Sequence, residues 1–458
     1  MKGLPTTTAK AGGRMFISYQ STASDDVDAF HSELRRLGIA TWVDKFDLGA
    51  GPIRENLVKA LEDPSVAGCI SWITNGIEAR KMIVDVELPT VAKRLKRDPA
   101  FYWRGICAGG FGPEELTKHL PRKLKGLADH NLLIWDGALN HRRAKSTAEL
   151  ATAILTDYLS GIEEYRPADE PLTIRLNADP GSKPPPKWDK CSDLDLYFGD
   201  SISRELCPDQ TQAAWEELVL RPVREVVDAC RAISRPVHFH GLFPTPAQIA
   251  LGMILGRYPQ PVYWRQWNRR TNETTTILVS SVVGDTPEAD VWWDKAPGKT
   301  NDILVLIGVS DSNLVVEKLL ECNLPDLYKS VSAIVRVGFP PGHVGQFPAD
   351  KPETIARAVE DVWEAIGQAR REGAIGGVHV AGAMPAAFAI PLGRRLAVGV
   401  PFVQTYDLRA LPEPPTRAGV AAGDASAASA SRGVSNEPPK PTHSYYPSVR
   451  LTRNNTGA

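Results

Sequence analysis

Two segments in the second half of this 458-residue chain repeat each other, and this duplication constrains the fold more than any other feature. Residues 237–256 read VHFHGLFPTPAQIALGMILG and residues 378–397 read VHVAGAMPAAFAIPLGRRLA, and the two align without a gap. Self-similarity at a fixed separation is typical of a repeated structural unit. The identical pairs are Val237 with Val378, His238 with His379, Gly241 with Gly382, Pro244 with Pro385, Ile249 with Ile390, Leu251 with Leu392, Gly252 with Gly393, and Leu255 with Leu396.

Each copy predicts a strand, a turn and a helix. The turn of small residues brings Pro244 or Pro385 to the helix start, and the glycine inside the helix should permit close packing on the sheet. A proline and another apolar strand follow in both copies, as PVYW and PFVQ. The duplication therefore predicts two Rossmann-like halves, at about residues 187–290 and 300–410.

The first part of the chain alternates short apolar runs with amphipathic helices, which is typical of a parallel α/β domain. The runs MFISY, IATWVD, GCISWIT, FYWRGICA and NLLIWDG predict strands. One helix should be capped by Ser24 and end at Gly38, and the last should start after the capping residue Ser146. We expect a flavodoxin-like domain over residues 13–163.

Two segments of unusual composition predict the domain boundaries. Residues 164–186 contain RPADEP and most of GSKPPPKW, where prolines deny the backbone regular hydrogen bonding, so we expect a linker. Residues 411–458 are rich in Ala, Ser, Gly and Pro, and we expect a disordered tail because few large apolar groups offset the entropy of ordering.

Charge and cysteine usage exclude several classes of function. The chain has 53 Lys plus Arg against 54 Asp plus Glu, so no global field attracts long nucleic acid or an anionic membrane. Its 6 cysteines are scattered without metal-ligand spacing, which predicts neither disulfides nor a bound metal. No segment has the apolar core of a signal peptide or a membrane span. We therefore expect a cytoplasmic protein.

The N-terminal region resembles TIR domains. The resemblance rests on FISYQSTAS at the first strand, WVDKFDLGAG after the second strand, and VDVEL at a later helix. It implies NAD+ hydrolysis to nicotinamide and ADP-ribose, with Glu87 as the catalytic carboxylate and no cofactor beyond NAD+ as substrate. Pro89 should interrupt the helix that carries Glu87. The NAD-binding residues that the resemblance implies are Ser18, Tyr19, Trp42, Asp44, Lys45 and Phe46.

A single carboxylate suits this reaction. Cleavage of the bond between nicotinamide and ribose passes through an oxocarbenium-like species, which an anion stabilises. Nicotinamide departs from a pyridinium as a neutral molecule, so no general acid is needed.

Residues 187–410 resemble a SAVED domain, through HFHGLFP, the duplicated HVAGAMP and the closing LGRRL. SAVED domains are similar to two fused CARF modules. The resemblance implies a sensor in bacterial cyclic-oligonucleotide-based anti-phage signalling (CBASS). A cyclic oligoadenylate, in particular cyclic tri-adenylate, would be its activator, and protomers would assemble into filaments that complete the NAD pockets.

Candidate ligand contacts lie where the strands of such halves end, because backbone amides and helix N-termini meet anionic ligands there. The run YWRQWNRR adds aromatic groups for stacking and arginines for phosphates. The candidate contacts with the cyclic oligonucleotide are His238, Gly241, Phe243, Pro244, Trp264, Arg265, Ser310, Asp311, Ser312, His379, Gly382, Met384 and Pro385.

Structural explanations remain open for several of these residues. A glutamate on a helix is usually solvated, a histidine on an apolar strand is commonly a hydrogen-bonded core residue, and the tryptophans of YWRQWNRR could belong to the core. Arg394 and Arg395 could form a solvated helix face. The alternative function is a non-enzymatic TIR scaffold whose assembly the nucleotide sensor controls.

Overall fold

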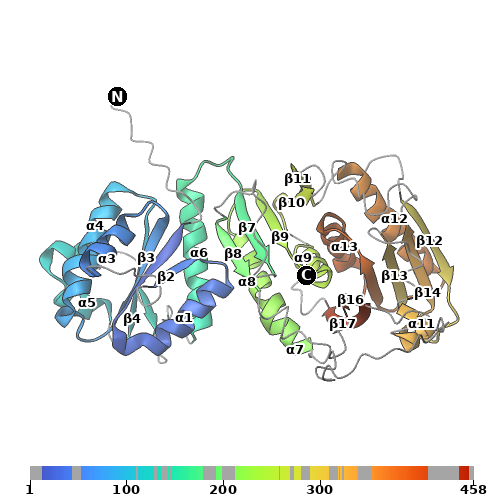
Figure 1. Cartoon of the computed structure of the whole chain (residues 1–458), viewed down its shortest axis with the longest axis horizontal. Coiled ribbons are helices and arrows are strands. Elements are labelled where there is room, and N and C mark those ends of the chain that lie inside the picture. The colour runs from blue at the N-terminus through green and yellow to red at the C-terminus, as the bar shows by residue number, and fades with distance from the viewer. Residues whose placement is uncertain are drawn as a thin grey trace, which may run out of the picture.

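The computed structural model describes the chain over residues 13–43, 53–109, 112–127, 132–135, 143–144, 146–178, 192–198, 212–256, 258–268, 273–279, 289–308, 318, 320–321, 324–338, 352–410 and 443–452. These parts form one sheet in the N-terminal domain and two sheets in the rest of the chain (Figure 1).

The N-terminal sheet is parallel, with the strand order β2-β1-β3-β4-β5-β6. The order of its first five strands is that of flavodoxin-like folds, as predicted. All five apolar runs predicted to be strands are strands. The bounds are β1 (Arg14–Ser18), β2 (Thr41–Val43), β3 (Val66–Ile73), β4 (Tyr102–Ala108), β5 (Leu133–Trp135) and β6 (Arg143–Ala144).

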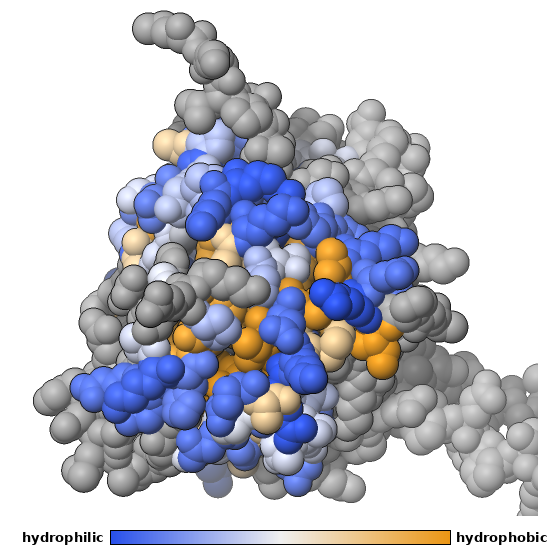
Figure 2. Space-filling view, turned by 90° about the vertical axis from the view of Figure 1, so that its left-hand side faces the viewer, coloured by the Kyte–Doolittle hydropathy of each residue, from blue (hydrophilic) through white to orange (hydrophobic). Residues whose placement is uncertain are grey.

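Helices cover both faces of this sheet. One face packs on α1 (Ser24–Arg36) and α6 (Thr147–Tyr165). The other packs on α3 (Ile53–Glu62), α4 (Leu88–Arg97) and α5 (Pro113–His119). Figure 2 views the domain from this second side, where hydrophobic side chains lie in a hollow among hydrophilic ones. The shorter helical segments are η1 (Ser21–Ala23), η2 (Ile77–Ala79), η3 (Ile83–Glu87) and η4 (Arg122–Leu127).

The predicted helix ends are confirmed at two of three positions. Gly38 follows α1 with a φ of 85°, in the left-handed region that favours glycine. The Ser146 hydroxyl accepts a hydrogen bond from the backbone N–H of Glu149 at 3.2 Å. Ser24 was expected to cap α1, but the cap is Ala23, because the short helix η1 runs directly into α1.

The second sheet has the order β11-β10-β9-β7-β8, parallel except for the pair β10 and β11. A continuous helical segment over residues 212–230 and a second helix, α9 (Thr245–Ile254), cover its apolar face. The strands are β7 (Leu172–Asn177), β8 (Leu194–Tyr197), β9 (Val237–Leu242), β10 (Val262–Asn268) and β11 (Glu273–Leu278). The helical elements are α7 (Gln212–Trp215), η6 (Glu216–Leu220), α8 (Arg221–Cys230) and α9 (Thr245–Ile254).

The third sheet has the order β12-β14-β13-β15-β16-β17, with antiparallel pairs at its two edges. Helices α12 and α13 cover one face, and α11 lies against the other. The strands are β12 (Asp290–Lys295), β13 (Ile303–Gly308), β14 (Ala333–Gly338), β15 (Val378–Ala383), β16 (Phe402–Ala410) and β17 (His443–Thr452). The helices are α11 (Pro325–Ser330), α12 (Pro352–Arg371) and α13 (Ala386–Gly399).

The second and third sheets are two copies of one arrangement, as the duplication predicts. The order β11-β10-β9-β7-β8 corresponds strand by strand to β17-β16-β15-β13-β14. Equivalent glycines hold equivalent positions in them. Gly241 in β9 has a φ of 127° and Gly382 in β15 a φ of 146°. A Cβ at either would overlap a backbone carbonyl oxygen of the neighbouring strand, of Leu176 or Ile307.

The two copies meet through α9 and α13, which pack directly on each other. Gly252 and Gly393 were expected to bring their helices close to the sheets. Instead each glycine lies against the other helix: Gly252 against Ile390 and Gly393 against Ile249. The duplicated glycine therefore serves the contact between the two halves.

Two predicted boundaries are wrong. Residues 172–177, inside the expected linker, form β7, the strand between β8 and β9 in the second sheet. Its alternate residues Leu172, Ile174 and Leu176 are fully buried. Residues 443–452, inside the expected disordered tail, form β17, which pairs antiparallel with β16.

The N-terminal domain and the second sheet share a hydrophobic core. Edge strand β8 lies on the end of α1, where the backbone N–H of Asp195 donates to the carbonyl of Gly38 at 2.7 Å. Helix α8 packs on α6, and charged side chains surround the contact. Arg36 pairs with Glu217 at 3.1 Å and Arg221 with Glu33 at 3.3 Å.

Candidate functional site

Glu87 ends a π-helical turn, η3, directly before α4. Proline has no N–H to donate, and its ring displaces the carbonyl four residues earlier. A π turn before Pro89 relieves this conflict, so the helix continues where we expected Pro89 to interrupt it. A π turn also precedes Pro222, where η6 runs into α8. Such π turns are frequent at functional sites.

The Glu87 side chain is buried, with 6% of its surface exposed. Glu87 is therefore not a solvated helix residue. Burial raises the pKa of the Cys69 thiol on β3, and the Glu87 carboxylate adds to that shift, so the two side chains lie within electrostatic reach. Glutamate side chains are seldom fully buried, so the burial of Glu87 makes it the strongest functional candidate in this domain.

Ser18 lies at the carboxyl end of β1, on the sheet face that carries η3. It is two residues from Phe16, which packs in the core under α3 and α4, and residues two apart on a strand share a face. Ser18 is 2% exposed, and its hydroxyl has no hydrogen-bond partner in the described part of the chain. A buried hydroxyl in this state can bind a ligand's polar group.

The other predicted NAD-binding residues differ in their surroundings. Trp42 is buried and stacks on Phe16 with ring centroids 4.9 Å apart, so it belongs to the core on this face of the sheet. Tyr19 follows β1 and is half-buried. Asp44, Lys45 and Phe46 lie outside the described residues.

The sequence reasoning missed a polar group beneath this site. Ser71 on β3 lies beside Ser18 in register, and its hydroxyl accepts a hydrogen bond from Nε1 of Trp103 at 3.1 Å. The Cys69 Sγ lies 3.7 Å from the same hydroxyl. A serine inside the apolar run GCISWIT was the available signal, since a buried polar group needs a partner.

In the second half of the chain, the structure separates the two predicted histidines from the predicted turns. His238 and His379 are the second residues of β9 and β15, at the amino ends of the strands, whereas Pro244 and Pro385 follow their carboxyl ends. Nδ1 of His379 lies 2.8 Å from the Tyr406 hydroxyl. Burial lowers the pKa of both histidines. These contacts are those of packed, neutral strand residues.

The residues of the turns after β9 and β15 differ in burial. Phe243 is 6% exposed and packs on Phe198, with ring centroids 5.1 Å apart. Met384 is also 6% exposed. Gly241 and Gly382 are required by the backbone approach described above. Pro244 and Pro385 are the N-caps of α9 and α13 and are half-buried, so both prolines are partly accessible.

Trp264 and Arg265 point to opposite faces of the second sheet, as neighbours on a strand must. Trp264 is 2% exposed and belongs to the core, in agreement with the structural alternative for this tryptophan. Arg265 is half-buried on the other face. Ser310, Asp311 and Ser312 lie outside the described residues. Arg394, offered as a solvated residue, instead donates to the Tyr258 carbonyl at 3.2 Å, whereas Arg395 is exposed and pairs with Glu360.

A row of polar side chains crosses the face of the second sheet that carries Arg265, and this row was not predicted. Register places Asp195, Arg175, His240 and Arg265 side by side on β8, β7, β9 and β10. Nε of Arg175 donates to Asp195 at 2.8 Å, and Nε2 of His240 lies 2.9 Å from the Ser192 hydroxyl. Burial, with repulsion from Arg265 and Arg175, lowers the pKa of His240 to about 3. Polar residues at alternate positions of β7 and β9 were the sequence signal.

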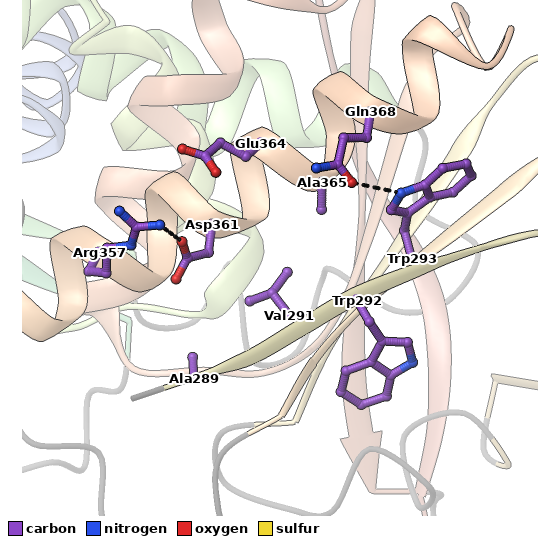
Figure 3. Close-up of a pocket in the computed structure, with 9 residues that line it drawn as sticks. All are labelled: Ala289, Val291, Trp292, Trp293, Arg357, Asp361, Glu364, Ala365 and Gln368. Atoms are coloured by element: carbon purple, nitrogen blue, oxygen red, sulfur yellow. Dashed lines mark hydrogen bonds and ion pairs between the residues drawn. The ribbon is translucent and has the colours of Figure 1, made fainter. Parts of the chain in front are cut away.

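A groove of about 480 Å³ lies between α12 and the edge strand β12 of the third sheet (Figure 3). None of its lining residues was predicted. In the described residues, no group of three or more His, Cys, Asp or Glu side chains could hold a metal ion. No helix in the described ranges is long and apolar enough to cross a membrane.

Comparison with known families identifies the sensor half. Residues 219–413 match the family model SAVED, described as "SMODS-associated and fused to various effectors sensor domain". The chain therefore contains a SAVED domain, and this match includes both copies of the duplicated segment.

Solved structures with the same kind of domain are similar to this chain at low identity. The Acinetobacter baumannii Cap4 SAVED/CARF-domain containing receptor with the cyclic trinucleotide 3'3'3'-cAAA has 13% identity and a TM-score of 0.43, over 74% of this chain and 85% of that chain. The Moraxella osloensis Cap4 SAVED/CARF-domain containing receptor has 12% identity and a TM-score of 0.38, over 88% of this chain and 86% of that chain. None of the curated proteins matches the chain.

Proposed function

We propose that this chain is a CBASS effector whose SAVED domain binds a cyclic oligoadenylate, in particular cyclic tri-adenylate, and thereby activates NAD+ hydrolysis by the N-terminal domain. The observation that carries the proposal is the SAVED match over residues 219–413 in a chain that begins with a separate flavodoxin-like domain. A sensor domain fused to a second domain implies that the second domain produces the output.

The ligand would bind at the carboxyl ends of β9 and β15. Two helices, α9 and α13, begin there at Pro244 and Pro385, and neither has a side-chain cap. The backbone N–H groups of a first helical turn lack intrahelical partners and favour phosphate oxygens. Because the two copies meet through α9 and α13, one cyclic ligand could contact both turns.

In the N-terminal domain, NAD+ would bind with its nicotinamide ribose beside Glu87. The bond between ribose C1′ and the nicotinamide nitrogen breaks, the electron pair leaves with nicotinamide, and water adds to C1′ and releases a proton. The Glu87 carboxylate would stabilise the positive charge that develops on the ribose. Its burial supports this role, since electrostatic stabilisation is strongest where water is excluded.

Assembly of protomers into filaments would complete the NAD pocket with residues of a neighbouring N-terminal domain. This supplies a reason for dependence on the cyclic nucleotide: the free protomer would hold Glu87 in an incomplete pocket.

The test is nicotinamide release from NAD+ by the purified chain, with and without cyclic di-, tri- and tetra-adenylate. We expect turnover with one ligand, and a loss of at least a hundredfold in Glu87→Gln. Glu55→Gln, at an exposed position on α3, is the matched control. Binding of the labelled ligand and thermal unfolding of Glu87→Gln are measured in parallel, so that loss of chemistry is separated from loss of folding or sensing.

The outcomes distinguish the two functions. Ligand binding and assembly without NAD+ turnover would support the scaffold function and contradict the enzymatic one. Absence of binding to every cyclic adenylate would contradict the ligand class.

A further inference from the structure

The groove between β12 and α12 is open to solvent and is lined by aromatic and charged side chains. Its volume of about 480 Å³ falls in the range of ligand pockets, about 300–1,000 Å³. None of its lining residues belongs to the turns proposed to bind the cyclic nucleotide. Its lining residues are Ala289, Val291, Trp292, Trp293, Arg357, Asp361, Glu364, Ala365 and Gln368.

Two adjacent tryptophans border the groove on opposite sides of β12 (Figure 3). Trp293 points toward α12, where its Nε1 donates to Oε1 of Gln368 at 3.0 Å. Trp292 points to the other side and is 42% exposed. A large exposed indole offers a flat apolar face to a side chain of a bound segment.

The charge in the groove is unbalanced. Arg357 pairs with Oδ1 of Asp361 at 2.5 Å. The other oxygen of Asp361 is buried and has no hydrogen-bond partner in the described residues. Glu364 lies one turn further along α12, is exposed, and forms no ion pair within the described ranges. Two carboxylates against one guanidinium leave room for one more positive charge.

The groove also runs along a free strand edge. Strand β12 is at the border of the third sheet and pairs with β14 on one side only, among the strands that the structure describes. The backbone groups on the other side of such a strand can pair with an additional strand.

We propose that this groove binds an extended segment of a partner protein, which adds as a strand to β12, places an arginine side chain toward Asp361 and Glu364 on the α12 side, and places an apolar side chain on Trp292 at the other side. A planar guanidinium can donate to the oxygens of both carboxylates at once, which a lysine ammonium does less well. An acidic segment or a nucleotide phosphate would be repelled by Glu364. The site is therefore distinct from the proposed nucleotide site and does not depend on it.

The test uses a fluorescently labelled nonapeptide of alternating threonine and valine with a central arginine, titrated with the full chain and followed by fluorescence polarisation. The matched peptide carries citrulline, which is planar but uncharged. We expect the arginine peptide to bind about tenfold more tightly, as for a charge-assisted hydrogen bond to a carboxylate. Glu364→Gln should abolish this preference, and Trp292→Ala should weaken both peptides.

Glu372→Gln is the control, because Glu372 is exposed just beyond α12 and does not line the groove. Equal binding of the two peptides, no binding of the arginine peptide up to ~1 mM, or an arginine preference that survives Glu364→Gln would overturn the proposal. Sedimentation velocity tests whether a second copy of this chain occupies the groove instead. A dimer that dissociates in Trp292→Ala would show that a second copy covers β12, and would also overturn it.

Discussion

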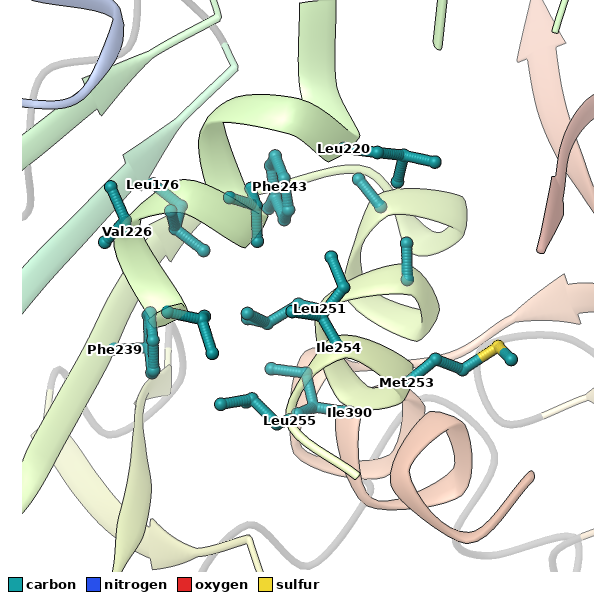
Figure 4. Packing of buried hydrophobic residues seen from close by; sticks show 14 of the residues in the cluster. Leu176, Leu220, Val226, Phe239, Phe243, Leu251, Met253, Ile254, Leu255 and Ile390 are labelled. Atoms are coloured by element: carbon teal, nitrogen blue, oxygen red, sulfur yellow. The ribbon is translucent and has the colours of Figure 1, made fainter. Parts of the chain in front are cut away.

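The contact between α9 and α13 predicts that a methyl group at Gly252 destabilises the sensor. Figure 4 shows the side chains beside this contact, with Leu251, Met253 and Ile254 on α9 and Ile390 on α13. A Cβ at Gly252 would overlap the carbonyl oxygen of Ile390 and would lie 2.9 Å from the backbone nitrogen of Arg394. Non-bonded carbon contacts need about 3.5–4.0 Å, so the helices must separate.

The magnitude follows from two opposing terms. Alanine in place of glycine inside a helix stabilises by about 1 kcal/mol. Over-packing costs about 1–3 kcal/mol, and the upper end applies here because the obstacle is backbone that cannot rotate away. Gly252→Ala should therefore lose about 2 kcal/mol of unfolding free energy.

Gly367→Ala in α12 is the matched control. Its Cβ would meet only Nη1 of Arg371, at 3.6 Å, so this change should gain about 1 kcal/mol from helix propensity alone. The two variants should thus differ by about 3 kcal/mol in urea unfolding at equal m-values. The double variant with Gly393→Ala should lose less than the sum of its parts, because one separation makes room for both methyl groups. A Gly252→Ala protein as stable as Gly367→Ala would refute the reasoning.

Two further predictions concern buried polar groups. The Arg235 side chain is 1% exposed and donates to carbonyls that include those of Pro167 and Glu170, so Arg235→Lys should cost at least ~3 kcal/mol by leaving several of them unpaired; an unchanged urea midpoint would contradict this. His240 has a folded pKa of about 3 against 6.5 for the free side chain, so the unfolded chain binds the extra proton between these values. The contribution of His240 to the free energy of unfolding is complete above pH 6.5 and falls as the pH drops toward 3, by up to ~1.4 kcal/mol per pH unit. His240→Gln should reduce that slope in acid titrations followed by circular dichroism.

The architecture was predictable wherever local pattern and burial agree. The N-terminal strands are apolar runs between amphipathic helices, and the duplicated segment indicated two similar halves. Strand β7 was missed although Leu172, Ile174 and Leu176 alternate, because proline-rich stretches on both sides favoured a linker. Strand β17 depends on pairing with β16 across the intervening chain, and local composition carries no information on such a partner.

The candidate sites were predictable only in part, because repetition does not distinguish packing from binding. The repeated glycines at 241 and 382 are needed for close backbone contact, and His238 and His379 are held by ring contacts at the amino ends of their strands. Glu87 was singled out through family resemblance, but its burial depends on a π turn that no sequence period indicates. The row through His240 requires strands from different parts of the chain to be in register.

The shared core between the N-terminal domain and the second sheet limits how such a chain can change by recombination. A SAVED sensor is described as fused to various effectors, which suggests free exchange of the first domain. Here an exchanged domain would have to present a surface that fits α8, and a backbone carbonyl where Gly38 now meets β8. A domain without that surface would leave apolar side chains of α8 in water. Replacement of the N-terminal domain therefore requires the matching helix surface to be inherited with it.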